Sequence, residues 1–367
     1  MTAGTLAPLD VAGRLPRLRE KLAAAEMPAL LVTKPENVRY LTGFTGSAAA
    51  LFVTRDEALF VTDGRYRTQA EEQLGTSGVR ARIEVGLTTS AQRELLAAVA
   101  REHATVGLEE HSVTWAEKRE YAEAFGVQVA PAGALVEGLR RVKDAGEVDR
   151  IRTACAIADD AFAALLPRLA EGVTERRFAL ELEFAMRERG ASGTSFDPII
   201  AAGPNAAKPH ARPSDRAVAR GEMVVCDFGC VVDGYCSDMT RTVWVGDPGA
   251  DARRLFEVVL ESQRAGRAAV APDVACAAVD KASRDVIADA GWADAFPHST
   301  GHGVGLEIHE APRVASTARD TLLEGDVVTI EPGVYLPGIG GVRIEDTVVV
   351  TATGAELLTV TPRELVL

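Results

Sequence analysis

Two nine-residue stretches of this 367-residue chain share one pattern of glycine, acidic and apolar residues. Residues 221–229 read GEMVVCDFG and residues 325–333 read GDVVTIEPG. In each stretch an apolar run typical of a buried strand ends in an acid, Asp227 in the first and Glu331 in the second. Burial of an unpaired carboxylate costs several kcal/mol or forces the group to take up a proton. Each strand therefore needs a partner group or ion that offsets the cost of burying its carboxylate.

The segments around the two stretches repeat in the same order. The expected elements are helices near 147–165 and 175–189, strands at 222–232 and 239–245, helices near 250–269 and 274–289, and strands at 326–331 and 342–351. This order predicts a duplicated helix–helix–hairpin unit, whose two halves form one central sheet with helices packed outside. Because the repeat is short and degenerate, coincidence stays open as an alternative.

Residues 1–140 have the pattern of a separate α/β unit. Apolar residues recur at helical spacing from Val11 to Leu22, a short apolar strand follows at 29–32, and two more flank Arg55–Glu57 in a hairpin pattern. The chain then becomes charged and irregular around 138–147. We expect a smaller N-terminal domain over 1–140 and a larger C-terminal domain over 141–367.

Composition excludes several classes of function. The net charge is −13, and Lys and Arg do not cluster, which argues against nucleic acid as a partner. No stretch approaches the roughly 20 apolar residues that cross a bilayer, and the N-terminus lacks the apolar run of a signal peptide. The five cysteines, an odd number without an export signal, predict free thiols. We expect a cytoplasmic protein without nucleic-acid or membrane partners.

A second acid follows each acidic strand, Asp238 in the first half and Glu345 in the second. If both hairpins belong to one sheet, all four carboxylates converge on one face. Four carboxylates cannot all stay ionised there without cations, and two divalent ions match their charge. Carboxylate-bridged metal pairs roughly 3.5–4 Å apart are a recurrent hydrolytic site. The alternative is that the acids are exposed strand ends or salt-bridge partners, for example of Arg241 and Arg343.

Histidines accompany the second half. His298, His302 and His309 lie within PHSTGHGVGLEIHEAP at 297–312, with glycines around the middle one. An imidazole can complete a carboxylate metal site, and a second imidazole can donate to an oxyanion. His210 lies in GPNAAKPHARP, where prolines on either side restrict it.

Asp227 is followed, in this order, by SDMTRT, GHGVG, HE, TIEPG and GVRIED. With these motifs the region 145–367 resembles the pita-bread metallopeptidases. Within that family the chain looks most like the prolidase and aminopeptidase P branch. Residues 37–65, with NVRYLTGFTGS and VTDGR, are similar to the creatinase-like N-terminal domain of these enzymes. The resemblance implies an α+β protein with a C-terminal pita-bread fold of pseudo-two-fold symmetry and a smaller creatinase-like α/β N-terminal domain. It also implies a homodimer.

The same resemblance implies a set of metal ligands. Asp227 would bind one metal, His302 and Glu331 mainly the other, and Asp238 and Glu345 would bridge the two. Glu331 would also pass a proton from the attacking hydroxide to the leaving nitrogen. Because the ligands are mostly oxygen, we expect two Mn²⁺ ions, with Co²⁺ or Zn²⁺ as possible substitutes.

Further residues would contact the substrate or support the ligands. His309 would stabilise the tetrahedral intermediate, and His210 would contact the substrate near the scissile bond. The remaining implied roles are a supporting one for His298, bracing of the ligands by Arg343, lining of the pocket by Tyr335, and a hydrogen bond from Thr240 to a ligand carboxylate.

The implied reaction is hydrolysis of Xaa-Pro bonds in small proline-containing peptides by a hydroxide held between the two metals. Such a bond is a tertiary amide without an N–H, so a closed pocket for the proline ring is a sensible specialisation. The substrate is either the N-terminus of a longer peptide or an Xaa-Pro dipeptide, and the sequence leans slightly to the former. The alternatives are a methionine aminopeptidase-like hydrolase, a creatinase-like hydrolase, and a non-catalytic pita-bread binding protein. All five ligand positions carry acceptable residues, which argues against the last two.

Overall fold

The computed structural model describes residues 6–366 of the chain and divides into two compact units. The smaller unit is Leu9–Arg140, and the larger contains the described residues from Arg141 onward together with those before Leu9. The described N-terminal residues are tied to the larger unit through Ala7, whose N–H donates to Asp149 and whose carbonyl accepts from Arg150. No helix within 6–366 has both the length and the apolar character needed to span a bilayer.

The smaller unit is a mixed six-stranded sheet in the order β4-β3-β2-β1-β5-β6. Its strands are β1 (Ala29–Val32), β2 (Ala49–Thr54), β3 (Ala58–Thr62), β4 (Arg82–Val85), β5 (Thr105–Leu108) and β6 (Gln128–Pro131). Its helices are α1 (Arg14–Ala24), α2 (Pro35–Thr42), α3 (Arg67–Thr76), α4 (Thr89–Ala100), α5 (Trp115–Phe125) and α6 (Leu135–Arg140). The strand predicted at 29–32 and the hairpin predicted around 55–57 are both present, the latter as β2 and β3.

The larger unit contains two helix pairs and several short sheets. Its helices are α7 (Ala145–Leu165), α8 (Glu175–Glu188), α9 (Ala250–Ala268) and α10 (Cys276–Asp289), with short 3-10 helices at Leu166–Arg168, Gly203–Asn205 and Ala293–Ala295. The strands before α9 are β7 (Gly193–Thr194), β8 (Ile199–Ala202), β9 (Glu222–Phe228), β10 (Cys230–Val232), β11 (Tyr235–Cys236) and β12 (Met239–Val245). The strands after α10 are β13 (Gly301–Gly303), β14 (Glu310–Val314), β15 (Val327–Ile330), β16 (Gly333–Leu336), β17 (Gly340–Arg343), β18 (Asp346–Thr351), β19 (Gly354–Leu357) and β20 (Leu365–Val366).

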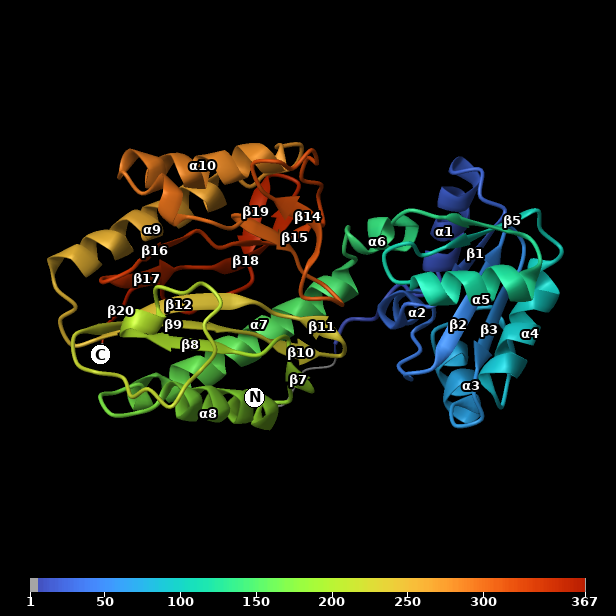
Figure 1. Ribbon diagram of the computed structural model, residues 1–367, viewed down its shortest axis with the longest axis horizontal. Coiled ribbons are helices and arrows are strands. Elements are labelled where there is room, and N and C mark those ends of the chain that lie inside the picture. Colours follow the sequence, from blue (N-terminus) through green and yellow to red (C-terminus); the bar gives the residue numbers. More distant parts are fainter. Residues whose placement is uncertain (1–5, 367) are drawn as a thin grey trace. The chain divides into compact units, whose positions relative to one another are not determined.

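The predicted duplication is confirmed by this order. Helices α7 and α8 precede the antiparallel pair β9–β12, and helices α9 and α10 precede the antiparallel pair β15–β18. In Figure 1, α7 and α8 lie along one side of the strands of this unit, and α9 and α10 lie along the other. The two halves are thus built alike, with the acidic strands between their helices.

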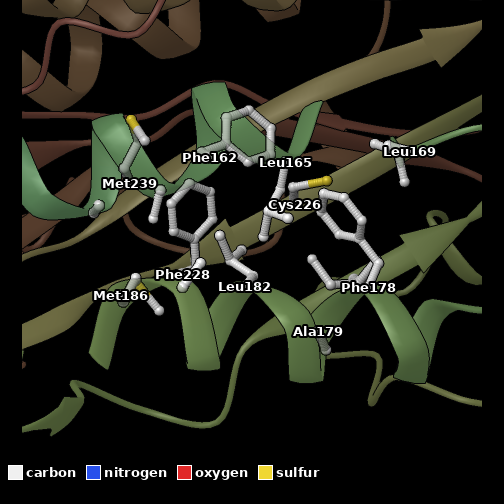
Figure 2. Close-up of a cluster of buried hydrophobic side chains, with 14 of the residues drawn as sticks. Phe162, Leu165, Leu169, Phe178, Ala179, Leu182, Met186, Cys226, Phe228 and Met239 are labelled. Carbon is white, nitrogen blue, oxygen red and sulfur yellow. The ribbon is translucent and has the colours of Figure 1, made fainter. Parts of the chain in front are cut away.

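Apolar side chains of the first half form a closed core between helices and sheet. Figure 2 shows Phe162 of α7, Phe178 of α8 and Phe228 of β9 meeting in this cluster. The rings of Phe162 and Phe228 are 4.9 Å apart, and all three side chains are fully buried. Truncation of a phenylalanine at such a site costs about 3–5 kcal/mol of stability. This packing holds β9, and with it Asp227, firmly in place.

The strands form separate sheets, so the prediction of one continuous central sheet is wrong. One sheet has the order β20-β12-β9-β8, another the order β14-β13-β15-β18-β19, and β16–β17 forms a separate two-stranded hairpin. The predicted strand at 342–351 is interrupted because Ile344 and Glu345 leave the strand pattern between β17 and β18. Glu345 N–H instead donates to Thr240 O at 3.1 Å, which joins the two sheets at this point.

Candidate metal centre

The four predicted carboxylates lie at strand ends that face one cavity. Asp227 is near the end of β9 and Glu331 directly follows β15, whereas Asp238 and Glu345 directly precede β12 and β18. The cavity has a volume of about 720 Å³, and every predicted site residue except Tyr335 and Thr240 lines it. The duplicated hairpins therefore bring acids that are far apart in the sequence to one place.

His302 lies among these acids. Its Nε2 atom is 3.4 Å from Oε1 of Glu331 and 3.5 Å from Oδ2 of Asp238. Ligand atoms of Asp238, His302 and Glu345 all lie within 4.8 Å of one another. Separations of 3.4 and 3.5 Å exceed an ordinary hydrogen bond. They suit ligands that share one cation, since ligand atoms about 2.1 Å from a metal lie roughly 3–3.5 Å apart.

The electrostatics of the acids reflect their crowding. Burial, and then the charges of Glu345, Asp227 and Glu331, raise the pKa of Asp238 well above its ordinary value. Burial likewise raises the pKa of Glu345, with Glu331 and Asp227 adding to it. For Glu331, burial raises the pKa to about 8. Without a cation, these groups can be buried together only by holding protons.

The local backbone fixes the tautomer of His302. Its Nδ1 lies 3.0 Å from the carbonyl oxygen of Gly303, so Nδ1–H donates and Nε2 presents its lone pair to the acids. Burial lowers the pKa of His302 to about 4, which keeps the ring neutral as a metal ligand must be. The glycines on either side permit close strand approach. A Cβ at Gly301 would lie 1.8 Å from Thr329 O, and one at Gly303 would lie 2.2 Å from Ala311 O.

Two buried carboxylate oxygens indicate whether the site suits a cation. Asp227 Oδ1 and Glu345 Oε1 have no hydrogen-bond partner among the described residues. The second oxygen of each group is engaged by the protein: Arg343 Nη2 lies 2.6 Å from Asp227 Oδ2, and Thr240 Oγ1 donates to Glu345 Oε2 at 2.7 Å. Buried polar atoms are rarely left unsatisfied. Unpaired oxygens in a cavity with a neutral histidine nitrogen fit a site for divalent metal ions.

Arg343 extends the site into a chain of hydrogen bonds. Its Nη1 donates to the Tyr335 hydroxyl at 2.7 Å, and this hydroxyl lies 2.9 Å from Nε2 of His298. His298 Nδ1 faces the carbonyl of Ser299 at 2.9 Å, so Nδ1–H donates there and Nε2 accepts from Tyr335. Tyr335 is buried and is absent from the described residues that line the cavity, in contrast to the lining role expected for it. Its hydroxyl instead links the side chains of Arg343 and His298.

Two more predicted residues reach the cavity from loops. The ring of His309 is 4.4 Å from that of His302 at an angle of 71°, and burial lowers its pKa. His210 is exposed on the loop between β8 and β9 and lines the same cavity. Both imidazoles are therefore placed to meet a molecule bound in front of the acids.

Sequence reasoning missed Arg313, which also lines the cavity. It lies in β14 directly across from His302 in β13. Among the described residues, none forms a hydrogen bond or ion pair with its exposed side chain. The signal in the sequence was a single cation between Pro312 and Val314, both buried, in a strand that follows the HE pair.

Comparisons with known proteins agree with this geometry. The profile of metallopeptidase family M24 matches residues 149–352, and that of the creatinase/prolidase N-terminal domain matches residues 14–142. A Xaa-Pro dipeptidase of Pyrococcus furiosus is 36% identical over 355 residues, which are 96% of this chain and 99% of the relative.

Solved structures give the same result over the whole chain. A Xaa-Pro dipeptidase from Bacillus anthracis has a TM-score of 0.93 at 38% identity, covering 97% of this chain and 100% of that one. An X-Pro aminopeptidase from Thermotoga maritima has a TM-score of 0.86 at 33% identity, covering 95% and 100%. The family and the two-part fold expected from the sequence are thereby confirmed. This chain belongs to metallopeptidase family M24.

Proposed function

We propose that this chain is a metal-dependent peptidase that hydrolyses the Xaa-Pro bond, and that Xaa-Pro dipeptides are its main substrates. The observation that carries the proposal is the pair of unpaired buried oxygens, on Asp227 and Glu345, in a cavity that also holds Asp238, His302 and Glu331. The relatives support it, since proteins named Xaa-Pro dipeptidase match nearly the full length of this chain.

The proposed ligands of two divalent ions are Asp227, Asp238, His302, Glu331 and Glu345. When bound, such ions lower the pKa of water and polarise the scissile carbonyl. Four of the five donors are carboxylates, which favours Mn²⁺, with Co²⁺ or Zn²⁺ as substitutes. Arg343 and Thr240 each hold one oxygen of a ligand carboxylate, which orients the other oxygen toward the cavity.

The protein side chains supply proton transfer and orientation. Glu331 takes a proton from the attacking water and gives it to the leaving proline nitrogen. The imidazole of His309 donates to the oxygen that becomes negative in the tetrahedral intermediate. His210 contacts the substrate beside the scissile bond, and its loop position lets it form one wall of the cavity. Arg343 holds the His210 loop through a hydrogen bond from its Nη1 to Pro209 O at 3.2 Å.

Arg313 favours the dipeptide over a longer peptide. An Xaa-Pro dipeptide carries its carboxylate on the proline, next to the scissile bond, whereas a longer peptide has a neutral amide there. A guanidinium recognises a carboxylate through charge-assisted hydrogen bonds. Two other arginines line the cavity, but Arg343 pairs with Asp227 and Arg212 lies 4.0 Å from Asp197. Arg313 has no such partner among the described residues, so it is the cation suited to this carboxylate. This argument outweighs the slight lean toward an aminopeptidase that the sequence alone suggested.

A side-by-side assay tests the proposal. Purified protein loaded with Mn²⁺ would be given an Xaa-Pro dipeptide and the matching Xaa-Pro-Yaa tripeptide, with and without a chelator. We expect cleavage of the dipeptide with the higher kcat/KM and loss of turnover on chelation. Cleavage of the tripeptide alone would contradict the dipeptidase assignment, and full turnover in metal-free protein would contradict the metal requirement.

Assembly and compartment are proposed on separate grounds. The resemblance to the pita-bread peptidases supports a homodimer, which light scattering after size-exclusion chromatography would test. The cytoplasm is supported by the cysteines, all five of which are buried free thiols.

A further inference from the structure

Glu175, the first residue of α8, is a carboxylate buried away from the metal centre. It is 0% exposed, and it is absent from the described residues that line the cavity. Oε1 accepts from the backbone N–H of Ala202 at 2.8 Å and from Nδ2 of Asn205 at 3.0 Å. Oε2 accepts from the N–H of Ser214 at 3.0 Å, from its hydroxyl at 2.6 Å and from Asn205 Nδ2 at 3.2 Å. All of these donors are neutral groups.

The donors come from the two ends of one loop. Ala202 and Asn205 lie where the loop leaves β8, and Ser214 lies where it turns back toward β9. The backbone adds two bonds at the second end, from Glu175 N–H to Arg216 O and from Arg176 N–H to Ser214 O, both 3.0 Å. One buried carboxylate thus fastens both ends of the loop at 202–214 to the start of a helix.

The residues between these ends face the metal centre. His210 and Arg212 line the cavity, and Pro209 O accepts from Nη1 of Arg343 at 3.2 Å. A loop without strands or an α-helix of its own keeps such a shape only if its ends are held. A buried carboxylate is stable only if its oxygens are satisfied, so the loop and the carboxylate depend on each other.

We propose that Glu175 is a positioning residue for the reaction of the proposed peptidase: it closes the loop at 202–214 and thereby sets His210 against the substrate. The inference rests on the proposed function for the role of His210. The fastening of the loop itself rests on the geometry around Glu175.

Glutamine is the informative replacement because it keeps the size of the side chain. Each oxygen of Glu175 faces a backbone N–H, that of Ala202 or that of Ser214, and neither N–H can become an acceptor. In Glu175→Gln, either orientation of the amide therefore places its NH₂ group opposite the N–H of Ala202 or of Ser214, where two donors face each other and no hydrogen bond can form. One end of the loop must then detach, while the helix itself is little changed.

The experiment compares Glu175→Gln with Glu188→Gln, which removes the same charge from an exposed position at the other end of α8. Hydrogen exchange of residues 202–214 is measured first, without substrate. We expect at least a tenfold faster exchange of this loop in Glu175→Gln, with the core strand β9 unchanged, and wild-type exchange in Glu188→Gln. Ser214→Ala, which removes one donor and leaves α8 intact, should give a smaller change in the same loop.

Kinetics with an Xaa-Pro dipeptide form the second readout. We expect Glu175→Gln to lower kcat/KM by about ten- to a hundredfold, mostly through KM, with the metal content of the wild type. Exchange that rises uniformly over the larger unit, or kinetics equal to those of Glu188→Gln, would overturn the positioning role. If the wild-type protein itself does not cleave the dipeptide, the proposed function fails, and loop exchange still decides whether Glu175 fastens the loop.

Discussion

Arg343 and Asp227 form an ion pair in which the guanidinium uses only one oxygen of the carboxylate. Nη2 of Arg343 lies 2.6 Å from Asp227 Oδ2, and Oδ1 remains buried without a partner among the described residues. This is the salt bridge that the sequence offered as an alternative to metal binding. The geometry reconciles the two readings, because the arginine orients the carboxylate and leaves its other oxygen for a cation.

Replacing Arg343 should therefore weaken metal binding as well as turnover. In Arg343→Met, Asp227 loses its orienting partner and Tyr335 loses a donor. We expect metal affinity to fall by about 10–100-fold, the usual effect of removing a group that orients a ligand. Chelator competition measures the affinity directly. Arg152→Met, which removes a half-buried arginine paired with Glu356, is the control and should bind metal like the wild type.

The metal-free protein should lose stability as pH rises. The pKa of Glu331 is raised from 4.5 to about 8 by burial, and those of Asp238 and Glu345 are raised as well. Above their ordinary pKa values these groups hold protons in the folded protein that the unfolded chain releases, so the free energy of unfolding falls with rising pH. The part due to Glu331 falls between about 4.5 and about 8.

Thermal melts with a chelator and with Mn²⁺ check the pH prediction. Because cations replace the protons, the increase in Tm on adding metal should be small near pH 5 and larger near pH 8. If the increase in Tm on adding metal is the same at every pH in this range, the buried acids do not hold protons in the metal-free protein, and the prediction is wrong.

Local patterns in the sequence predicted the positions of helices and strands better than the way in which the strands pair. The helices expected at 175–189 and 250–269 are observed as Glu175–Glu188 and Ala250–Ala268, because apolar spacing along a helix is a local property. The break at Ile344–Glu345 was not foreseen. It depends on a hydrogen bond from Glu345 to Thr240, more than a hundred residues away in the sequence.

The acids of the site could be predicted because they too belong to local patterns in the sequence, whereas the residues that support them could not. Asp227 and Glu331 end apolar strands, which is visible in the sequence itself. Glu175 and Arg313 lie in ordinary helical and strand patterns. The partners of Glu175 come from a segment later in the chain, and Arg313 reaches the cavity only through its pairing with β13. Tyr335 was assigned to the pocket through the family resemblance, and only its contacts show that its hydroxyl accepts from Arg343 and donates to His298 instead.

Arg313 should separate dipeptides from tripeptides. In Arg313→Met the cavity loses a cation that no described residue pairs with, so the fold has little reason to change. Loss of a hydrogen bond to a charged group costs about 1.5–3 kcal/mol, so KM for an Xaa-Pro dipeptide should rise roughly ten- to a hundredfold. The matching tripeptide should be affected far less. Equal losses for both substrates would remove Arg313 from carboxylate recognition.

Arg241 should contribute to stability in a way that metal cannot restore. Its side chain is fully buried, and Nη2 lies 2.8 Å from Asp346 Oδ1 and 2.7 Å from the carbonyl of Thr361. Removing one partner of a buried ion pair leaves an uncompensated charge and costs about 3–5 kcal/mol. Arg363 still pairs with Asp346, so Arg241→Met should lie at the lower end of this range. Urea unfolding with saturating Mn²⁺ measures the loss, and a change below about 1 kcal/mol, the size of an exposed ion pair, would contradict it.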